Sequence, residues 1–142
     1  MKEKILLVDD EKDFVETLAA RMRNRNMEVV TATSAIEALA RQDADSYDAV
    51  ILDLQMPGMD GLEALRRFKE LNPKLQVILL TGKATVEKGV TAMKLGALDL
   101  LEKPADIETL TQKIKDASAR KMVLVKEENE NSIKEIIGSK AW

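Results

Sequence analysis

Five polar side chains follow closely on short apolar runs, and together their types could perform one reaction. They are Asp9, Asp10, Asp53, Thr81 and Lys103. Three carboxylates placed together would repel one another, so a divalent cation is the expected counter-charge, and an all-oxygen site suits Mg²⁺ or Mn²⁺. Because Mg²⁺ takes only one or two carboxylates directly, Asp53 would stay partly free to act as a nucleophile. A hydroxyl and an ammonium group nearby would hold the oxygens of a phosphoryl group, so the set indicates phosphoryl transfer to Asp53.

Each of these residues also has an ordinary structural explanation. An Asp pair after a strand commonly forms a turn or a helix N-cap. Thr81 before Gly82 is typical of a turn, and Lys103 before Pro104 is typical of a surface lysine at a helix boundary. Asp53 is the least ordinary of the set, because an unpaired carboxylate at the end of an apolar strand costs free energy. The functional hypothesis therefore depends on all five residues meeting at one edge of the fold.

Composition excludes several other classes of chemistry. Histidine and cysteine are both absent, which rules out imidazole acid/base catalysis, thiolate nucleophiles, disulfides and the usual structural zinc sites within this chain. The 22 basic and 25 acidic residues leave a formal net charge of -3, which provides no general attraction to nucleic acid or to an anionic membrane. The apolar core of the N-terminal segment is only four residues long. We expect a soluble, cytoplasmic protein.

Strand-like and helix-like segments alternate along the chain. Apolar runs suited to buried strands lie at 5–8, 28–32, 49–54, 76–80 and 98–101. Between and after them, apolar residues recur at helical spacing. Strands that are apolar throughout are typical of a parallel sheet covered by helices on both faces. The pattern predicts an α/β fold with a doubly wound, five-stranded parallel sheet and five helices, in which ligands bind at the carboxyl ends of the strands.

Three helix starts carry capping signals. Ser34 with Glu37, and Asp60 with Glu63, have the spacing of a capping box, and Asp106 is placed to cap the last helix.

Four segments resemble the receiver domain of bacterial response regulators. They are VDDEKD at 8–13, LDLQMPGMDG at 52–61, LLTG at 79–82 and GALDLLEKP at 96–104. The resemblance implies a flavodoxin-like sheet with strand order 2-1-3-4-5. It extends from about Lys4 to a helix ending near Met122, so residues 1–122 would form the receiver domain and residues 123–142 a C-terminal tail.

The resemblance also implies the metal ligands of the site. Asp10 would hold Mg²⁺ directly and Asp9 chiefly through water. Asp53 and the backbone carbonyl of Gln55 would complete the protein ligands.

Phosphoryl transfer would use the remaining residues. Asp53 would accept a phosphoryl group from the phosphohistidine of a histidine kinase or a phosphotransfer protein, which agrees with the absence of histidine here. Thr81 would bind this group through its hydroxyl, and Lys103 would form an ion pair with it. The peptide bond from Lys103 to Pro104 is expected to be cis.

Output in the family is read on the face formed by the fourth helix, the fifth strand and the fifth helix, here residues 85–117. An unidentified downstream protein, or a second copy forming a homodimer, would bind this face. Most receivers carry Tyr or Phe at the position of Leu100, and that aromatic ring moves inward on phosphorylation. We therefore expect any switching movement here to occur in the backbone and helix near residues 82–90.

The tail reads VLVKEENENSIKEIIGSKAW and is too short for a DNA-binding domain. Ile133, Ile136 and Ile137 would share one helical face, while the run EENEN is expected to be a solvated break. Together with Trp142, this tail would cap the domain, reach a partner or begin a linker.

Two other functions are compatible with the sequence. The first is a receiver-fold interaction module that works without phosphorylation, an alternative suggested by Leu100. The second is a phosphohydrolase of the haloacid dehalogenase type. That class requires a second Asp two residues after the nucleophile, where this chain has Gln55. We therefore expect a phosphoacceptor with no separate substrate turnover.

Overall fold

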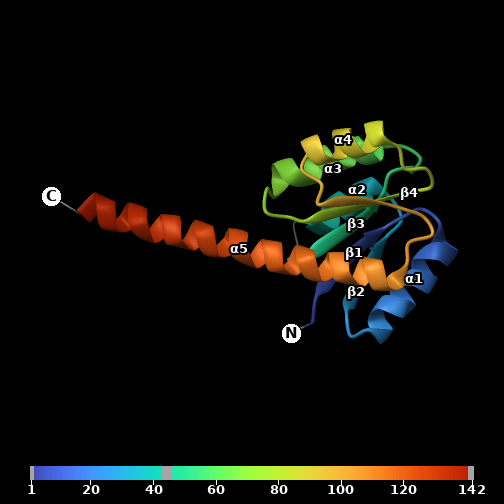
Figure 1. Cartoon of the computed structure of the whole chain (residues 1–142), viewed down its shortest axis with the longest axis horizontal. Helices are drawn as coiled ribbons and strands as arrows, with labels where there is room; N and C mark the ends of the chain where they lie inside the picture. The colour runs from blue at the N-terminus through green and yellow to red at the C-terminus, as the bar shows by residue number, and fades with distance from the viewer. Residues whose placement is uncertain (1, 43–45, 141–142) are drawn as a thin grey trace.

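The computed structural model describes residues 2–42 and 46–140, which form one sheet with helices on both faces (Figure 1). The strands are β1 (Lys4–Val8), β2 (Glu28–Ala32), β3 (Ala49–Asp53), β4 (Val77–Thr81) and β5 (Asp99–Glu102). The helices are α1 (Lys12–Asn24), α2 (Ala35–Gln42), α3 (Gly61–Leu71), α4 (Val86–Lys94) and α5 (Ile107–Lys140). Among the described residues, no helix combines the length and the apolar character needed to cross a membrane.

All neighbouring strands of the sheet are parallel, in the order β2-β1-β3-β4-β5. The predicted fold class and strand order are therefore confirmed, and every predicted apolar run lies within one residue of the observed strand. The order reverses beside β1, because the chain adds β2 on one side of β1 and β3 on the other. This reversal opens the carboxyl edge of the sheet next to β1 and β3, where ligands bind in such folds.

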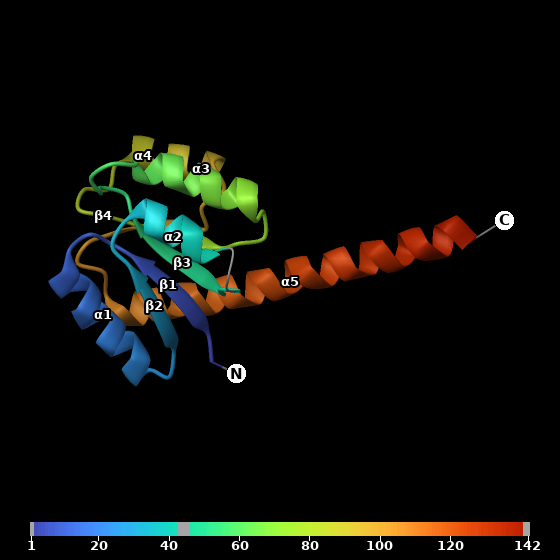
Figure 2. The same cartoon turned by 180° about the vertical axis from the view of Figure 1, so that it is seen from behind.

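Two apolar cores, one on each face, hold the sheet in place. Alternate side chains of β1 point to opposite faces, so Leu6 and Val8 belong to one core and Ile5 and Leu7 to the other. Helices α2, α3 and α4 cover the first face, and α1 and α5 cover the second (Figure 2). Both faces of β3 are buried, which explains why its sequence is continuously apolar.

The predicted caps form at three helix starts. The Ser34 hydroxyl accepts a hydrogen bond from the backbone amide of Glu37 at 3.1 Å, and the Asp60 carboxylate accepts one from Leu62 at 3.2 Å. The Asp106 carboxylate accepts one from the amide of Thr109 at 3.0 Å. The reciprocal half of each predicted capping box is absent, since Glu37 accepts from Thr33 instead. At the other box, Glu63 forms ion pairs with arginines of its own helix.

Helix α5 runs without interruption from Ile107 to Lys140, so two expectations about the tail are wrong. The helix does not end near Met122, and the run EENEN at 127–131 is helical rather than a break. Neither glycine nor proline occurs between 107 and 137, and Lys126 lies 4.0 Å from Glu130 one turn later. The division into a domain and a tail at residue 122 stays a prediction, and Trp142 lies outside the described residues.

The loop from β3 to α3 approaches the sheet closely at Gly61. A Cβ atom at this position would lie 2.5 Å from the Cα atom of Leu54, and the Gly61 amide donates to the Leu54 carbonyl at 3.3 Å. Only a residue without a side chain allows this contact between two backbone segments. Gly61 therefore fixes where α3 begins relative to the end of β3.

We predict opposite effects for alanine at two glycines. Gly61→Ala should lower the free energy of unfolding by about 1–3 kcal/mol, because the new methyl group meets rigid backbone. Gly89→Ala should raise it by about 0.5–1 kcal/mol, because Gly89 lies inside α4 and the nearest atom, Cδ2 of Leu100, would be 4.0 Å away. Urea unfolding of both variants and the parent would measure the difference, and equal stabilities for the two variants would contradict it.

Candidate functional site

The carboxyl edge of the sheet brings together side chains from three strand ends. Asp9 and Asp10 follow β1, Asp53 is the last residue of β3, and Lys103 follows β5. Parallel strands end at the same edge, and the order of the sheet places β3 directly beside β1. The backbone amide of Lys103 donates to the Thr81 carbonyl at 2.8 Å, which holds the end of β5 against β4.

The three aspartates form an oxygen-rich cluster. One carboxylate oxygen from each of Asp9, Asp10 and Asp53 lies within 4.8 Å of the others. Asp9 and Asp53 are buried, at 1% and 2% exposure, whereas Asp10 is exposed. Hard divalent cations such as Mg²⁺ prefer carboxylate oxygens and keep several waters, for which the exposed side of Asp10 leaves room. The residues present therefore fit the predicted Mg²⁺ site.

Lys103 supplies the positive charge of this cluster. Its Nζ atom donates to Asp9 Oδ2 at 2.7 Å and lies 3.5 Å from Asp53 Oδ2. The side chain of Lys103 is mostly buried, with 15% of its surface exposed. Because a buried charge is costly unless it is paired, Lys103 depends on Asp9 and compensates part of the negative charge of Asp53.

Burial raises the pKa of the Asp53 carboxyl group to about 6. The backbone amide of Gln55 donates to Asp53 Oδ1 at 3.1 Å and opposes this rise, while the negative charge of Asp9 adds to it. For Lys103, burial by itself would lower the pKa of the ammonium group. The hydrogen bond that Lys103 donates to Asp9, together with the charges of Asp9, Asp53 and Glu11, outweighs burial and raises that pKa.

Thr81 ends β4 at the predicted place, but its hydroxyl is engaged with its own loop. It donates to the backbone carbonyl of Lys83 at 3.3 Å and accepts from the backbone amide of the same residue at 3.3 Å. The side chain is fully buried. Thr81 is thus positioned at the edge of the cluster, with a hydroxyl that would have to leave Lys83 before it could bind anything else.

Gln55 lies two residues beyond Asp53, in the loop that follows β3. Its backbone amide contacts the Asp53 carboxylate, whereas its backbone carbonyl stays a predicted metal ligand. The side-chain oxygen of Gln55 would lie 3.4 Å from a Cβ atom placed on Gly82, so this side chain reaches toward the loop after β4. The peptide bond from Lys103 to Pro104 is cis, as predicted.

Two contacts of Lys103 were missed by the sequence reasoning. Glu11 Oε1 lies 3.7 Å from its Nζ atom, and the ring of Phe14 lies beneath the ammonium group, 4.5 Å from ring centroid to Nζ. A cation over an aromatic face is stabilised by the ring quadrupole. Glu11 could have been suspected because it directly follows the Asp pair. Phe14 offered no such signal, since its spacing is that of an ordinary helix core residue.

The loop after β4 is held to its surroundings by weak polar contacts. The Glu102 carboxylate accepts from the backbone amide of Ala84 at 3.4 Å, and Lys88 Nζ donates to the Lys83 carbonyl at 3.0 Å. Leu100 packs with the core on the α4 face of the sheet, near Gly89. The aliphatic Leu100 side chain is therefore part of the packing between β5 and α4.

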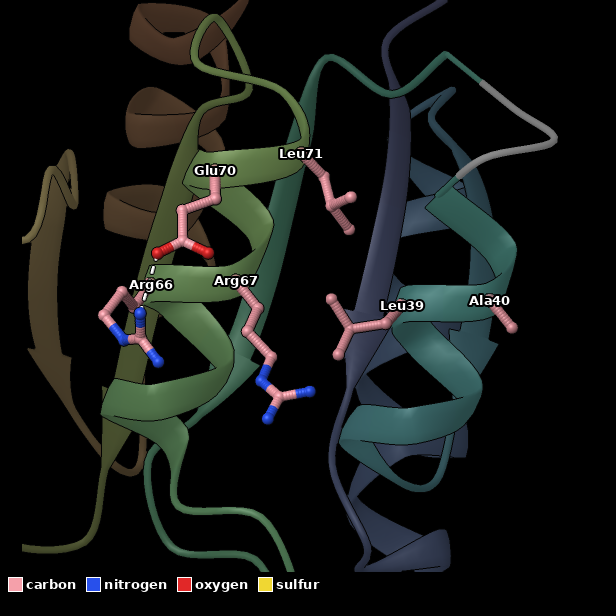
Figure 3. Close-up of a pocket in the computed structure, with 6 residues that line it drawn as sticks. All are labelled: Leu39, Ala40, Arg66, Arg67, Glu70 and Leu71. Carbon is pink, nitrogen blue, oxygen red and sulfur yellow. Dashed lines mark hydrogen bonds and ion pairs between the residues drawn. The ribbon is translucent and has the colours of Figure 1, made fainter.

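A separate hollow between α2 and α3 does not belong to this site (Figure 3). It is lined by Leu39, Ala40, Arg66, Arg67, Glu70 and Leu71. These residues lie in the C-terminal halves of their helices, toward the opposite edge of the sheet. Ion pairs with Glu63 and Glu70 already neutralise the arginines, so the hollow offers little attraction to an anion.

Comparisons with known proteins agree on one family for this chain. The family model for the response regulator receiver domain matches residues 5–115. The transcriptional regulatory protein ZraR of Salmonella typhimurium is 37% identical over 115 residues, which cover 81% of this chain and 26% of that protein. The chain thus spans about a quarter of the length of the curated relatives it matches.

Solved structures agree with this assignment. A response regulator receiver domain from Clostridium thermocellum superposes with a TM-score of 0.81 at 35% identity, covering 86% of this chain and 98% of that one. A response regulator from Burkholderia pseudomallei, solved with a phosphorylated aspartic acid, a calcium ion and citrate, has a TM-score of 0.75 at 30% identity and covers 92% and 75%. This chain belongs to the receiver domains of two-component response regulators.

Proposed function

We propose that this chain is a phosphoacceptor that takes a phosphoryl group from the phosphohistidine of a histidine kinase, or of a phosphotransfer protein, onto Asp53. The observation that carries the proposal is the arrangement of Asp53, Asp9, Asp10 and Lys103 at one sheet edge. The phosphorylated aspartic acid in the similar Burkholderia structure supports the same chemistry. No separate substrate turnover is proposed, because Gln55 has no carboxyl group to act as an acid or base at the position where a hydrolase of the aspartyl type requires one.

In the proposed reaction an oxygen of the ionised Asp53 carboxylate attacks phosphorus in line with the leaving group. A new O–P bond forms as the N–P bond to the kinase histidine breaks, and the electron pair of that bond stays on the imidazole nitrogen. The Gln55 amide holds Oδ1 of Asp53, which orients the carboxylate while its other oxygen faces Lys103. Bound Mg²⁺ would neutralise the charge that accumulates on the carboxylates and the phosphoryl oxygens.

Lys103 and Thr81 would bind the product. A phosphoryl group brings a charge of about -1.5 to -2 and strong acceptor oxygens, which compete with Asp9 for the Lys103 ammonium group. Thr81 would release the Lys83 backbone and turn its hydroxyl to a phosphoryl oxygen. Since Lys83 also accepts from Lys88, losing the Thr81 contact would loosen the start of α4. In this way the proposed chemistry changes the loop between β4 and α4.

The first test is formation of the adduct. Incubating the protein with Mg²⁺ and acetyl phosphate should add the mass of one phosphoryl group to the intact chain, in an acid-stable and base-labile form. Asp53→Asn should abolish the adduct, and Lys103→Ala should slow its formation by roughly 10²-fold, because a fixed positive charge is lost. Asp116→Asn, which removes an exposed carboxylate on α5, is the matched control and should react normally.

The outcomes separate the alternatives. No adduct on the wild type would contradict the proposal and favour a receiver-fold module that works without phosphorylation. Rapid turnover of phosphate monoesters would indicate a phosphohydrolase instead.

The second test uses pH in the absence of divalent cations. Folding raises the pKa of Asp53 from 3.8 to about 6, so ionisation of this group favours the unfolded chain. The stabilising contribution of the protonated form is present below pH 3.8 and is lost as the pH rises through about 6. Asp53→Asn stays neutral, so its free energy of unfolding should exceed that of the wild type by up to about 2–3 kcal/mol above pH 6.

Urea unfolding in EDTA at about pH 7.5 and about pH 4.5 measures this difference, which should shrink at the lower pH. Adding Mg²⁺ at the higher pH should stabilise the wild type more than Asp53→Asn. If Asp53→Asn were less stable than the wild type above pH 6, the predicted sign of the difference in free energy of unfolding would be wrong.

The third test concerns the switch. Beryllium fluoride with Mg²⁺ should increase amide hydrogen exchange within residues 82–90, since Thr81 leaves the Lys83 backbone. Thr81→Ala should weaken this response, whereas Thr81→Ser, which keeps the hydroxyl, should preserve it. Exchange in this segment that is unchanged by beryllium fluoride in the wild type would contradict the predicted movement.

A further inference from the structure

Lys103 reaches the aspartate cluster through a long side chain that must be held in place. Its Nζ atom donates to Asp9 Oδ2 at 2.7 Å and lies 3.5 Å from Asp53 Oδ2. The flexible stem of a lysine gives up much of its rotamer freedom when the ammonium group is fixed. A phosphoryl group on Asp53 would compete with Asp9 for that ammonium group, so the contact that now fixes Lys103 would weaken during the reaction. A contact that persists through this exchange would keep Lys103 in position.

The ring of Phe14 provides such a contact. The ammonium nitrogen of Lys103 lies over the ring, 4.5 Å from its centroid. The attraction between a cation and an aromatic face acts out to about 6 Å from the ring centroid. The nitrogen can therefore move a short way toward Asp53 without leaving the ring. A hydrogen bond to Asp9, in contrast, depends closely on distance and angle and would be lost over a similar movement.

Packing holds the Phe14 ring in place. The residue is partly buried and packs against the core that α1 and α5 form on their face of the sheet. With Leu18 of α1, and with Pro104 and Ala105, it also lines a small hollow. Pro104 and Ala105 directly follow Lys103 in the chain, so the ring lies between its own helix and the segment that carries the lysine. It is a fixed surface against which the ammonium group rests.

An aromatic ring stabilises the ammonium group without adding to the negative charge of the site. One carboxylate oxygen from each aspartate of the cluster already lies within 4.8 Å of the others. A further buried carboxylate beside Lys103 would repel an incoming phosphoryl group, and Glu11, at 3.7 Å, is largely exposed, so water screens its charge. The Phe14 ring has no net charge and attracts the cation through its quadrupole. It therefore leaves the ammonium group available to phosphoryl oxygens.

We propose that Phe14 is a positioning residue that acts on phosphoryl transfer through Lys103. Its ring keeps the ammonium group within reach of Asp53 while the contact with Asp9 gives way to the phosphoryl group. This role of Phe14 rests on the proposed function of Asp53 as the phosphoacceptor. An aliphatic side chain at position 14 would fill a similar space but would not attract the cation.

The rate of adduct formation with Mg²⁺ and acetyl phosphate, followed by intact mass, tests this role. Acetyl phosphate requires no partner protein, so the rate does not depend on docking of a kinase. Phe14→Leu should slow the reaction by about 3- to 10-fold, because the attraction of the ring for the ammonium group is lost. In a Lys103→Ala background the same substitution should change the rate by less than about twofold, because no cation is left over the ring. Urea unfolding would verify that every variant is folded.

Fluorinated phenylalanine at position 14 separates the electrostatics of the ring from its packing. Each added fluorine weakens the negative face of the ring with little change in its shape, so the logarithm of the rate should fall in step with the number of fluorine atoms. Phe68 is the other phenylalanine of the chain and offers the matched control. It is fully buried in the opposite core, where the same replacements should leave the rate unchanged.

The outcomes distinguish this role from the proposed function. If Phe14→Leu reacted as fast as the wild type, or if it slowed the reaction equally with and without Lys103, the role of Phe14 would be overturned and Asp53 would remain the phosphoacceptor. A rate that does not respond to fluorine at position 14 would overturn it as well, since the ring would then act by packing alone. A wild type that forms no adduct would overturn the proposed function, and the role of Phe14 with it.

Discussion

The ion pair between Lys103 and the buried Asp9, with Asp53 beside it, is the interaction on which this site depends. Asp9 and Asp53 stand at the ends of strands that are apolar throughout, where an uncompensated carboxylate is costly. Lys103 lies 94 residues away from Asp9 in the sequence, so the pair forms only if β1, β3 and β5 end at one edge. The sheet order and the parallel direction of the strands meet this requirement. The cluster has three carboxylates and one ammonium group, so it carries an excess of negative charge that favours binding of a divalent cation.

The backbone that carries the aspartate cluster is held by close packing, whereas the loop after β4, where movement is proposed, is held by fewer contacts. Two apolar cores fix the strands, and the close backbone contact at Gly61 sets the start of α3 relative to Asp53. The loop after β4, in contrast, is held by the Thr81 hydroxyl and by contacts of 3.0 and 3.4 Å to backbone groups. Packed cores rarely deform continuously, whereas such polar contacts exchange partners readily. These contacts support the proposal that a change at the site moves residues 82–90.

Helix α5 belongs to two environments. Its first half buries aliphatic side chains under the sheet, and its second half continues in water with polar anchors and an apolar stripe to one side. No glycine or proline occurs in α5 before Gly138, so the helix continues beyond the part that packs against the sheet. Apolar side chains such as Met122 and Ile133 are exposed along this second half.

The sequence by itself determined the local and periodic features of this protein. The apolar runs located each strand to within one residue, and the types of residue at the strand ends identified the aspartates and Lys103 before any contact was known. Tertiary structure alone decided how those side chains meet. It showed the Thr81 hydroxyl bound to Lys83, the Lys103 ammonium over the Phe14 ring, and α5 continuing through a run predicted to break. The spacing of apolar residues in the sequence shows which face of a helix or strand is buried. Which of several nearby groups a polar side chain contacts depends instead on distances that are set by packing across the whole sheet.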